Sequence, residues 1–160
     1  MNHSDLSSLI LALEHGTKLH ISLVFFDRFG NSMTRLAKAQ KIHTSPMCDL
    51  AKNSGHFQNC LRCRETMLRL ARAHKKPFGG YCVNGIYEYC HPVCIGQEVA
   101  AVILIGNLFD GSPAQHRRLE KHFDSPMTQT MESILTRKDC PRLAGIIESY
   151  LRFLFKSIWS

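Results

Sequence analysis

Residues 78–109 read FGGYCVNGIYEYCHPVCIGQEVAAVILIGNLF, and this stretch decides the fold. It contains three strand-like runs, which we expect over 78–83, 86–95 and 98–108. The runs are broken at Asn84-Gly85 and at Gly96-Gln97. Asn-Gly is a strong signal for a tight hairpin, because it accepts the positive φ angles of the turn. The stretch therefore predicts an antiparallel meander.

Two further strands are expected on the N-terminal side. Residues 21–26 are β-branched or aromatic, and a weaker run follows near Ser32–Leu36. Helical periodicity, prolines and glycines predict helices over 5–16, from Pro46, and over 57–74, 113–123, 127–136 and 143–159. Five antiparallel strands, with helices inserted after the second and flanking helices at the ends, predict an α+β domain of PAS or GAF type. We expect one domain over residues 1–160.

Composition excludes several classes of protein. The chain has 160 residues and is 44% hydrophobic, which suits one compact domain and argues against disorder. No apolar run reaches the roughly 18–20 residues that a membrane span requires. The N-terminus lacks the basic leader of a signal peptide. We therefore expect a cytoplasmic protein with no membrane partner.

The net charge of +7 is concentrated on one short segment. Residues 60–76 carry six Lys or Arg side chains against the single Glu65. A basic helix of this kind can contact phosphate, so a nucleic-acid-binding module is one hypothesis. The other interpretation is a solvated helix face, with the arginines pointing outward.

Seven cysteines are present, and six of them fall between residues 48 and 94. An odd number, without a secretory leader, argues against a disulfide framework. Cys60 and Cys63 form a CxxC pair at the start of an expected helix, where residues i and i+3 share a face. The helix N-terminus and the nearby Arg62 and Arg64 favour the thiolate form of these cysteines.

Cys48 and Cys82 extend this pair to a C-x11-C-x2-C-x18-C pattern, with Cys82 expected on the first meander strand. Four thiolates suit Zn(II) or an iron–sulfur cluster, so Cys48, Cys60, Cys63 and Cys82 are candidate metal ligands. Two other interpretations stay open. The cysteines can be buried and inert, or Cys60 and Cys63 can be the redox-active thiols of a redox protein or enzyme.

The central meander strand offers candidates for ligand binding. Strand alternation places Glu88 and Cys90 on one face, with Cys94, and Tyr89 and His91 on the other. His91 is then either a ligand contact or a histidine of the core or pocket wall. The candidate ligand-binding residues are Tyr81, Glu88, Cys90, His91 and Asn107. The sequence has no nucleophile elbow, phosphate loop, HExxH pair or paired catalytic carboxylates, so we predict no enzymatic activity.

Several motifs of the chain belong together, namely Ser45-Pro46-Met47-Cys48, Cys60, the run Pro77–Ile86, Pro92-Val93 and Ile105-Gly106-Asn107. Taken together they resemble one known family, the PocR-type sensory domain. Cys48, Cys60 and Cys82 fall on the three cysteines of that family, and Gly85 and Pro92 on its glycine and proline. Val83 and Asn84 replace its His and Ala, Asn107 replaces its Gln, and Cys63, Cys90, His91 and Cys94 are additional.

The resemblance implies a PAS-like sensor of a bacterial signalling or transcription regulator. Such domains are usually attached to an AraC-type DNA-binding domain, a kinase or a cyclase, and bind small polar organic molecules such as diols. The additional cysteines point instead to a metal or cluster, and so to redox or oxygen sensing. Occupancy is expected to reach the output domain through the terminal helices, in a homodimer.

Overall fold

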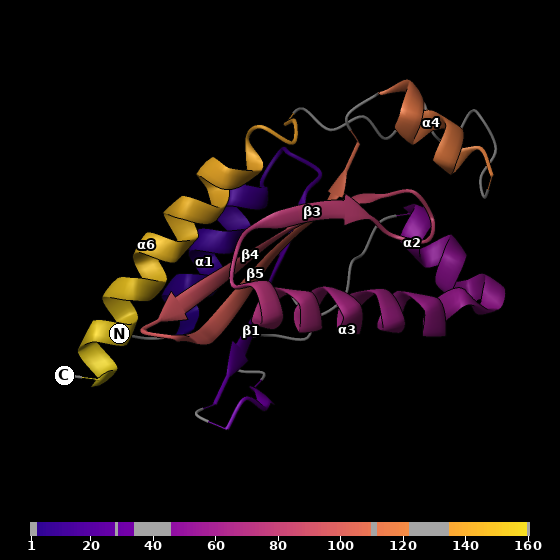
Figure 1. The fold of residues 1–160 in the computed structure, drawn as a ribbon. Coiled ribbons are helices and arrows are strands. Elements are labelled where there is room, and N and C mark those ends of the chain that lie inside the picture. Colours follow the sequence, from indigo (N-terminus) through magenta and orange to yellow (C-terminus); the bar gives the residue numbers. More distant parts are fainter. Residues whose placement is uncertain (1–2, 28, 34–45, 110–111, 122–134, 160) are drawn as a thin grey trace.

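The computed structural model describes residues 3–27, 29–33, 46–109, 112–121 and 135–159 (Figure 1). The chain is an α+β protein. Its elements are α1 (His3–Glu14), β1 (His20–Phe26), β2 (Ser32–Met33), α2 (Pro46–Ala51), the π-helical segment η2 (Lys52–His56), α3 (Phe57–His74), β3 (Phe78–Tyr81), β4 (Tyr87–Ile95), β5 (Glu98–Leu108), α4 (Pro113–Leu119) and α6 (Cys140–Trp159). The expected helix over 127–136 falls almost wholly outside the described residues.

The strands form one antiparallel sheet in the order β2-β1-β5-β4-β3. The expected meander is present as β3, β4 and β5. The predicted fifth strand needs correction, because β2 contains only Ser32 and Met33, paired with the end of β1. Four strands therefore make up the body of the sheet in the described part of the chain, and β2 is a two-residue extension at its edge.

The loop between β3 and β4 differs from the expected two-residue turn. The strand β3 ends at Tyr81, so Cys82 lies in the loop and not on the strand. Cys82 N–H donates to Ile86 O, and Gly85 N–H donates to Cys82 O. Of the three described residues between Cys82 and Ile86, only Gly85 takes a positive φ, of 88°. This arrangement is a three-residue hairpin loop whose positive-φ glycine follows the turn.

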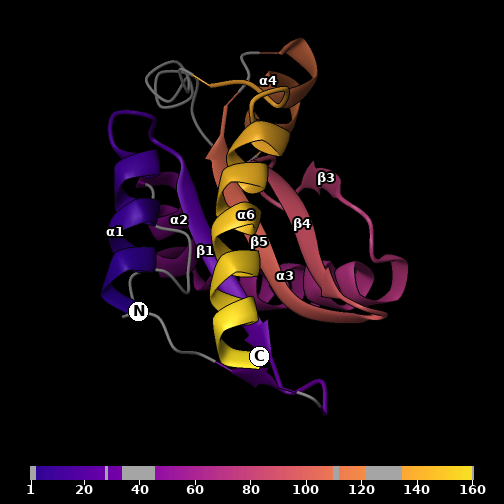
Figure 2. The same cartoon turned by 90° about the vertical axis from the view of Figure 1, so that its left-hand side faces the viewer.

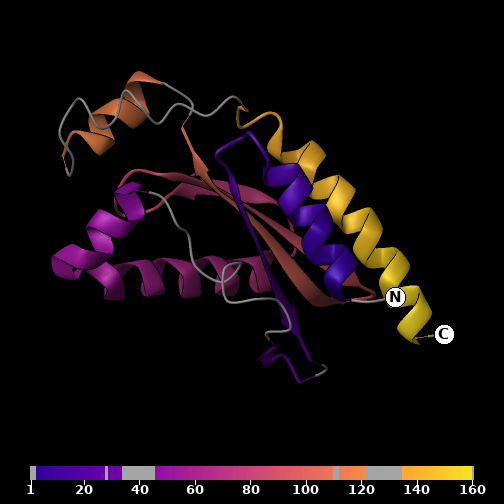
Figure 3. The same ribbon diagram turned by 180° about the vertical axis from the view of Figure 1, so that it is seen from behind.

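The sheet separates two layers of helices. Figures 1 and 2 show α1 and α6 side by side along one face, and Figure 3 shows α3 on the opposite side. The larger core cluster lies between the sheet and α1 and α6, and includes Leu6, Ile21, Ile103, Ile147 and Leu151. Two smaller clusters lie on the α3 side. The helix α3 spans the predicted residues 57–74, and β3 begins directly after Pro77.

The strand β4 alternates as predicted. Tyr89 and Val93 belong to the cluster under α1 and α6, whereas Cys90 and Cys94 belong to a cluster under α3. The strand β4 lies next to the edge strand β3, and it packs against α3 on one face and α6 on the other.

Candidate functional site

A pocket lies on the α3 side of the sheet, between η2 and α3 on one wall and β4 with the β3–β4 loop on the other. The pocket and the open solvent at its mouth together hold about 670 Å³ of space that protein atoms leave free. Its lining residues are Cys48, Lys52, Phe57, Cys60, Leu61, Cys63, Arg64, Cys82, Val83, Asn84, Ile86 and Glu88. The chain reaches this geometry because η2 bends at Gly55, whose φ is 85°, so α2 and α3 can border the same space.

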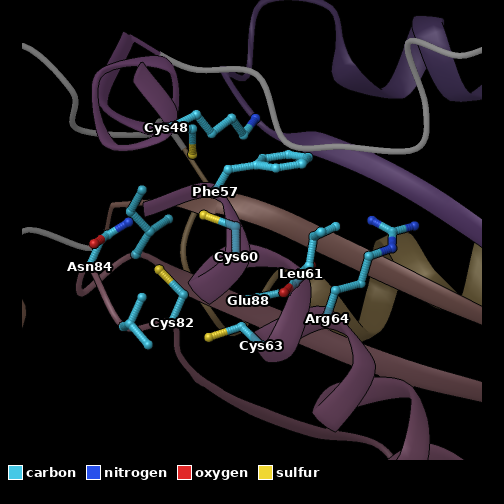
Figure 4. Close-up of a pocket in the computed structure, with 12 residues that line it drawn as sticks. Cys48, Phe57, Cys60, Leu61, Cys63, Arg64, Cys82, Asn84 and Glu88 are labelled. Carbon is cyan, nitrogen blue, oxygen red and sulfur yellow. The ribbon is translucent and has the colours of Figure 1, made fainter. Parts of the chain in front are cut away.

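The structure brings the four candidate metal ligands into the lining of this one pocket. Cys48 comes from α2, Cys60 and Cys63 from α3, and Cys82 from the β3–β4 loop. Figure 4 shows the sulfur atoms of Cys60, Cys63 and Cys82 directed toward a common space, with Cys48 approaching from one side. Thiols from three separate elements therefore border one site.

Two of these thiols, Cys60 and Cys82, have raised pKa values and are held in the protonated form. Burial raises the pKa of Cys82 to about 12, although backbone N–H groups of the loop oppose the shift. Burial also raises the pKa of Cys60, and nearby Lys52 only partly offsets the effect. The expectation that the helix start and the neighbouring arginines favour a Cys60 thiolate is therefore wrong, because desolvation of the anion outweighs them.

Charged and polar side chains form part of the pocket wall, namely Lys52, Arg64, Asn84 and Glu88. Glu88 is 7% exposed, and it lies near enough to Arg64 for their charges to interact. Figure 4 shows both side chains at the pocket, with the guanidinium of Arg64 extending away from Glu88. Burial lowers the pKa of Arg64, and the negative charge of Glu88 counteracts this. The expectation that the arginines of this helix all point outward is wrong for Arg64, which lines the pocket.

A β-bulge in β5 lies opposite Glu88, which lines the pocket. Tyr87 pairs with Leu108 and Tyr89 pairs with Ile105, so Glu88 lies opposite two residues, Gly106 and Asn107. Asn107 takes a φ of 60° and is buried. A bulge re-aims a side chain, and here Asn107 Oδ1 accepts a hydrogen bond from Cys48 Sγ at 3.7 Å. The contact ties α2 to the end of β5.

Within the described residues, no group of three or more His, Cys, Asp or Glu side chains is arranged to hold a metal ion. The donor set suits a soft metal, but the thiols would have to move closer together to form a complete coordination shell.

The remaining candidates occupy three different places. Tyr81 lines a second groove, between α3 and β3, which shares Cys63, Cys82, Val83 and Glu88 with the pocket. Cys90 is fully buried under α3 in an apolar cluster, and burial raises its pKa to about 12. His91 lies on the opposite face of the sheet, where its ring contacts Glu148 of α6.

Sequence reasoning did not single out Lys52, Phe57 or Asn84, which also line the pocket. Asn84 is 6% exposed, and its position before Gly85 suggested only a turn residue. No periodicity in the sequence connects Lys52 to Cys60, because the kink at Gly55 separates them.

Comparison with known families identifies one family for this chain. A family model described as the sensory domain found in PocR matches residues 2–143. The chain belongs to the PocR sensory-domain family. The matched range contains the whole PocR-domain pocket but only the first residues of α6. No curated protein and no solved structure matches the chain significantly.

The family places the chain among sensory domains, which recognise a ligand within a signalling or regulatory protein. Among the described residues, none of the helices is long and apolar enough to span a membrane.

Proposed function

We propose that this PocR domain senses a small polar organic molecule, such as a diol, in the pocket lined by the four cysteines. The observation that carries the proposal is the buried carboxyl of Glu88 in a pocket that Arg64 and Asn84 also line, among thiol and apolar side chains. A carboxylate accepts hydrogen bonds from ligand hydroxyls, and a guanidinium or an amide donates to ligand oxygens. Polar groups of this kind orient a small ligand that apolar walls alone would hold loosely.

The domain is proposed to be PAS-like and to act as a homodimer within a bacterial regulator. Its output is an AraC-type DNA-binding domain, a kinase or a cyclase, in the same chain or in a partner. The sheet order β2-β1-β5-β4-β3 supports a ligand layer on one face and an output layer, α1 and α6, on the other. Occupancy of the pocket shifts the equilibrium between two arrangements of the terminal helices. The size of that shift is set by the difference in the ligand's affinity for the two arrangements.

Thermal unfolding with a panel of small diols and hydroxy acids tests the ligand. A ligand at a hundred times its dissociation constant stabilises the folded state by about 2.7 kcal/mol. We expect a saturable rise in melting temperature that Glu88→Gln abolishes. Glu65→Gln is the matched control, because Glu65 is an exposed acid on the outer side of α3. A rise that persists in Glu88→Gln would place the ligand elsewhere, and no rise with any compound would refute this ligand class.

A metal or iron–sulfur centre held by Cys48, Cys60, Cys63 and Cys82 is the second candidate. It is favoured by the convergence of the four thiols on one pocket, and it requires them to close around the metal. Metal analysis and absorbance between about 320 and 420 nm, on protein purified without oxygen, test it. Absence of metal, together with a melting temperature that is unchanged by added Zn(II) or by EDTA, would exclude this centre.

A further inference from the structure

A side-chain hydrogen bond ties the sheet to α6 on the face opposite the pocket. His91 Nε2 lies 2.6 Å from Glu148 Oε2. Arg152 holds the other carboxylate oxygen, Oε1, through Nε at 2.8 Å and Nη2 at 2.6 Å. The side chains of His91 and Glu148 are only 14% and 22% exposed. A hydrogen bond to a carboxylate that is partly sheltered from water is stronger than one made in the open.

The same strand forms a wall of the pocket. Glu88 precedes His91 by three residues, which is about 10 Å along a strand, and the two side chains lie on opposite faces. The pairing of β4 with β5 is irregular on both sides of His91, first opposite Glu88 and again between Val93 and Cys94. Because strands bend at such irregularities, the segment 89–93 can tilt as a unit when the Glu88 end moves.

The family match includes one member of this contact and ends before the other. His91 is additional to the motif positions that carry the PocR resemblance, and Glu148 lies beyond residue 143, where the family match ends. The pocket residues, in contrast, all fall within the matched range.

We propose that the His91–Glu148 contact is the positioning link through which pocket occupancy reaches α6. The inference rests on the proposed function and names the residues that carry its output. A molecule seated against Glu88 displaces the start of β4, His91 moves with the strand, and the hydrogen bond transfers the displacement to α6. Coupling between two sites is reciprocal, so the state of α6 also sets the state of the pocket.

Hydrogen exchange of α6 amides tests the link without knowledge of the natural ligand. N-ethylmaleimide serves as the occupant, with peptide mass spectrometry identifying protein modified at Cys60 or Cys63. We expect alkylation to change exchange of residues 140–159 by about fivefold or more in the native chain. The change should disappear in Glu148→Gln, which keeps the side-chain shape but removes the carboxylate charge, and in His91→Gln, which removes the imidazole ring.

The decisive quantity is the ratio of the α6 exchange rate in alkylated protein to the same rate in free protein. A merely structural role would shift exchange equally in both forms and leave this ratio unchanged. Arg142→Gln is the matched control, since Arg142 is an exposed cation on the same helix, and it should keep the native ratio. Arg152→Gln leaves His91 and Glu148 in contact and should give an intermediate ratio. If His91→Gln or Glu148→Gln fails to fold, the ratio in Arg152→Gln serves as the test of the link.

Two results would overturn the link. If His91→Gln and Glu148→Gln both keep the native ratio, α6 responds to the pocket by a route that does not pass through the His91–Glu148 contact. No response of α6 in the native chain would refute the coupling altogether. Ligand binding in the pocket is measured separately by thermal unfolding, so neither result depends on whether a diol binds.

Discussion

The two faces of the central sheet bury different kinds of side chain. Under α1 and α6 the sheet contributes an almost continuous apolar cluster, beside which His91 contacts Glu148. Under α3 the apolar clusters are smaller, and a pocket on this side is bordered by thiols and by polar side chains that include Arg64 and Glu88. Protein interiors are normally close-packed, so the space under α3 indicates a place for a guest. One face stabilises the domain, and the other leaves room for recognition.

The largest expected effect concerns thiol chemistry on the pocket face. The pKa of Cys82 is raised from 9.0 to about 12, so at neutral pH its thiolate fraction is about a thousandfold lower than that of an ordinary cysteine. Because the thiolate is the nucleophile, alkylation of Cys82 should be slower by a similar factor and should rise about tenfold for each pH unit. Mass spectrometry of iodoacetamide-treated protein between pH 7 and 10 measures this, with a short unfolded peptide containing Cys82 as the reference. Rapid labelling of Cys82 at pH 7 would show that the pocket is wetter than the structure indicates.

Truncating one residue on each face tests the comparison directly. Ile147 is fully buried under α6, so Ile147→Ala should lower the free energy of unfolding by about 2–5 kcal/mol. Leu61 is half-buried and borders the pocket, so Leu61→Ala should cost less than about 1.5 kcal/mol, since space is already present there. Urea unfolding of both variants provides the measurement. Equal losses would mean that the two faces are packed alike.

A smaller effect is expected at the bulge in β5. Asn107 has a φ of 60°, a conformation that costs an ordinary L-residue about 1–2 kcal/mol. Both Asn107→Gly and Asn107→Ala lose the bond from Cys48, but only Ala bears this strain. The Gly variant should therefore be more stable than the Ala variant by about 1 kcal/mol, the reverse of the usual order inside a strand. If Ala is the more stable of the two in urea unfolding, the bulge has not kept its geometry.

The smallest expected effect is a dependence of stability on pH at α6. Burial raises the pKa of Glu148, but hydrogen bonds from His91 and Arg152 outweigh burial and hold it below its usual value of 4.5. The stability that Glu148 contributes is therefore present above pH 4.5 and is lost as the pH falls through the folded pKa. The free energies of unfolding of the native chain and Glu148→Gln, measured by urea unfolding, should differ by less than about 1 kcal/mol at pH 7. The two values should converge toward pH 3.

Glu14 provides the opposite sign as a control. Burial raises its pKa, and the bond that Oε1 accepts from Ile21 N–H only partly offsets this. A carboxyl with a raised pKa contributes most below pH 4.5 and less as the pH rises through the folded pKa. Above the folded pKa the native chain should therefore be less stable than Glu14→Gln, and the two should converge as the pH falls. At pH 7 the difference between native chain and variant should thus have the opposite sign for Glu14 and for Glu148. The same sign at both positions would contradict the pKa directions of the structure.

Much of the fold is readable from local pattern. The helix α3 begins and ends at the predicted residues 57 and 74, and β4 exposes Cys90 and Cys94 to one layer and Tyr89 and Val93 to the other, as alternation requires. The extent of β2 and the loop after Tyr81 were less predictable. Short strands and turns depend on pairing with distant segments, and Asn84-Gly85 is compatible with more than one hairpin geometry.

Sequence patterns determined the helix and strand order, the face on which each β4 side chain falls, and the membership of a sensory family, because periodicity and motif spacing are local properties of the chain. Only the tertiary structure decided the charge state and partners of the functional groups. It placed Arg64 in the lining of the pocket, raised the pKa values of Cys60 and Cys82, aimed Asn107 at Cys48 and joined His91 to Glu148. Desolvation and contact depend on what packs around a residue, and those neighbours come from segments that are distant in sequence.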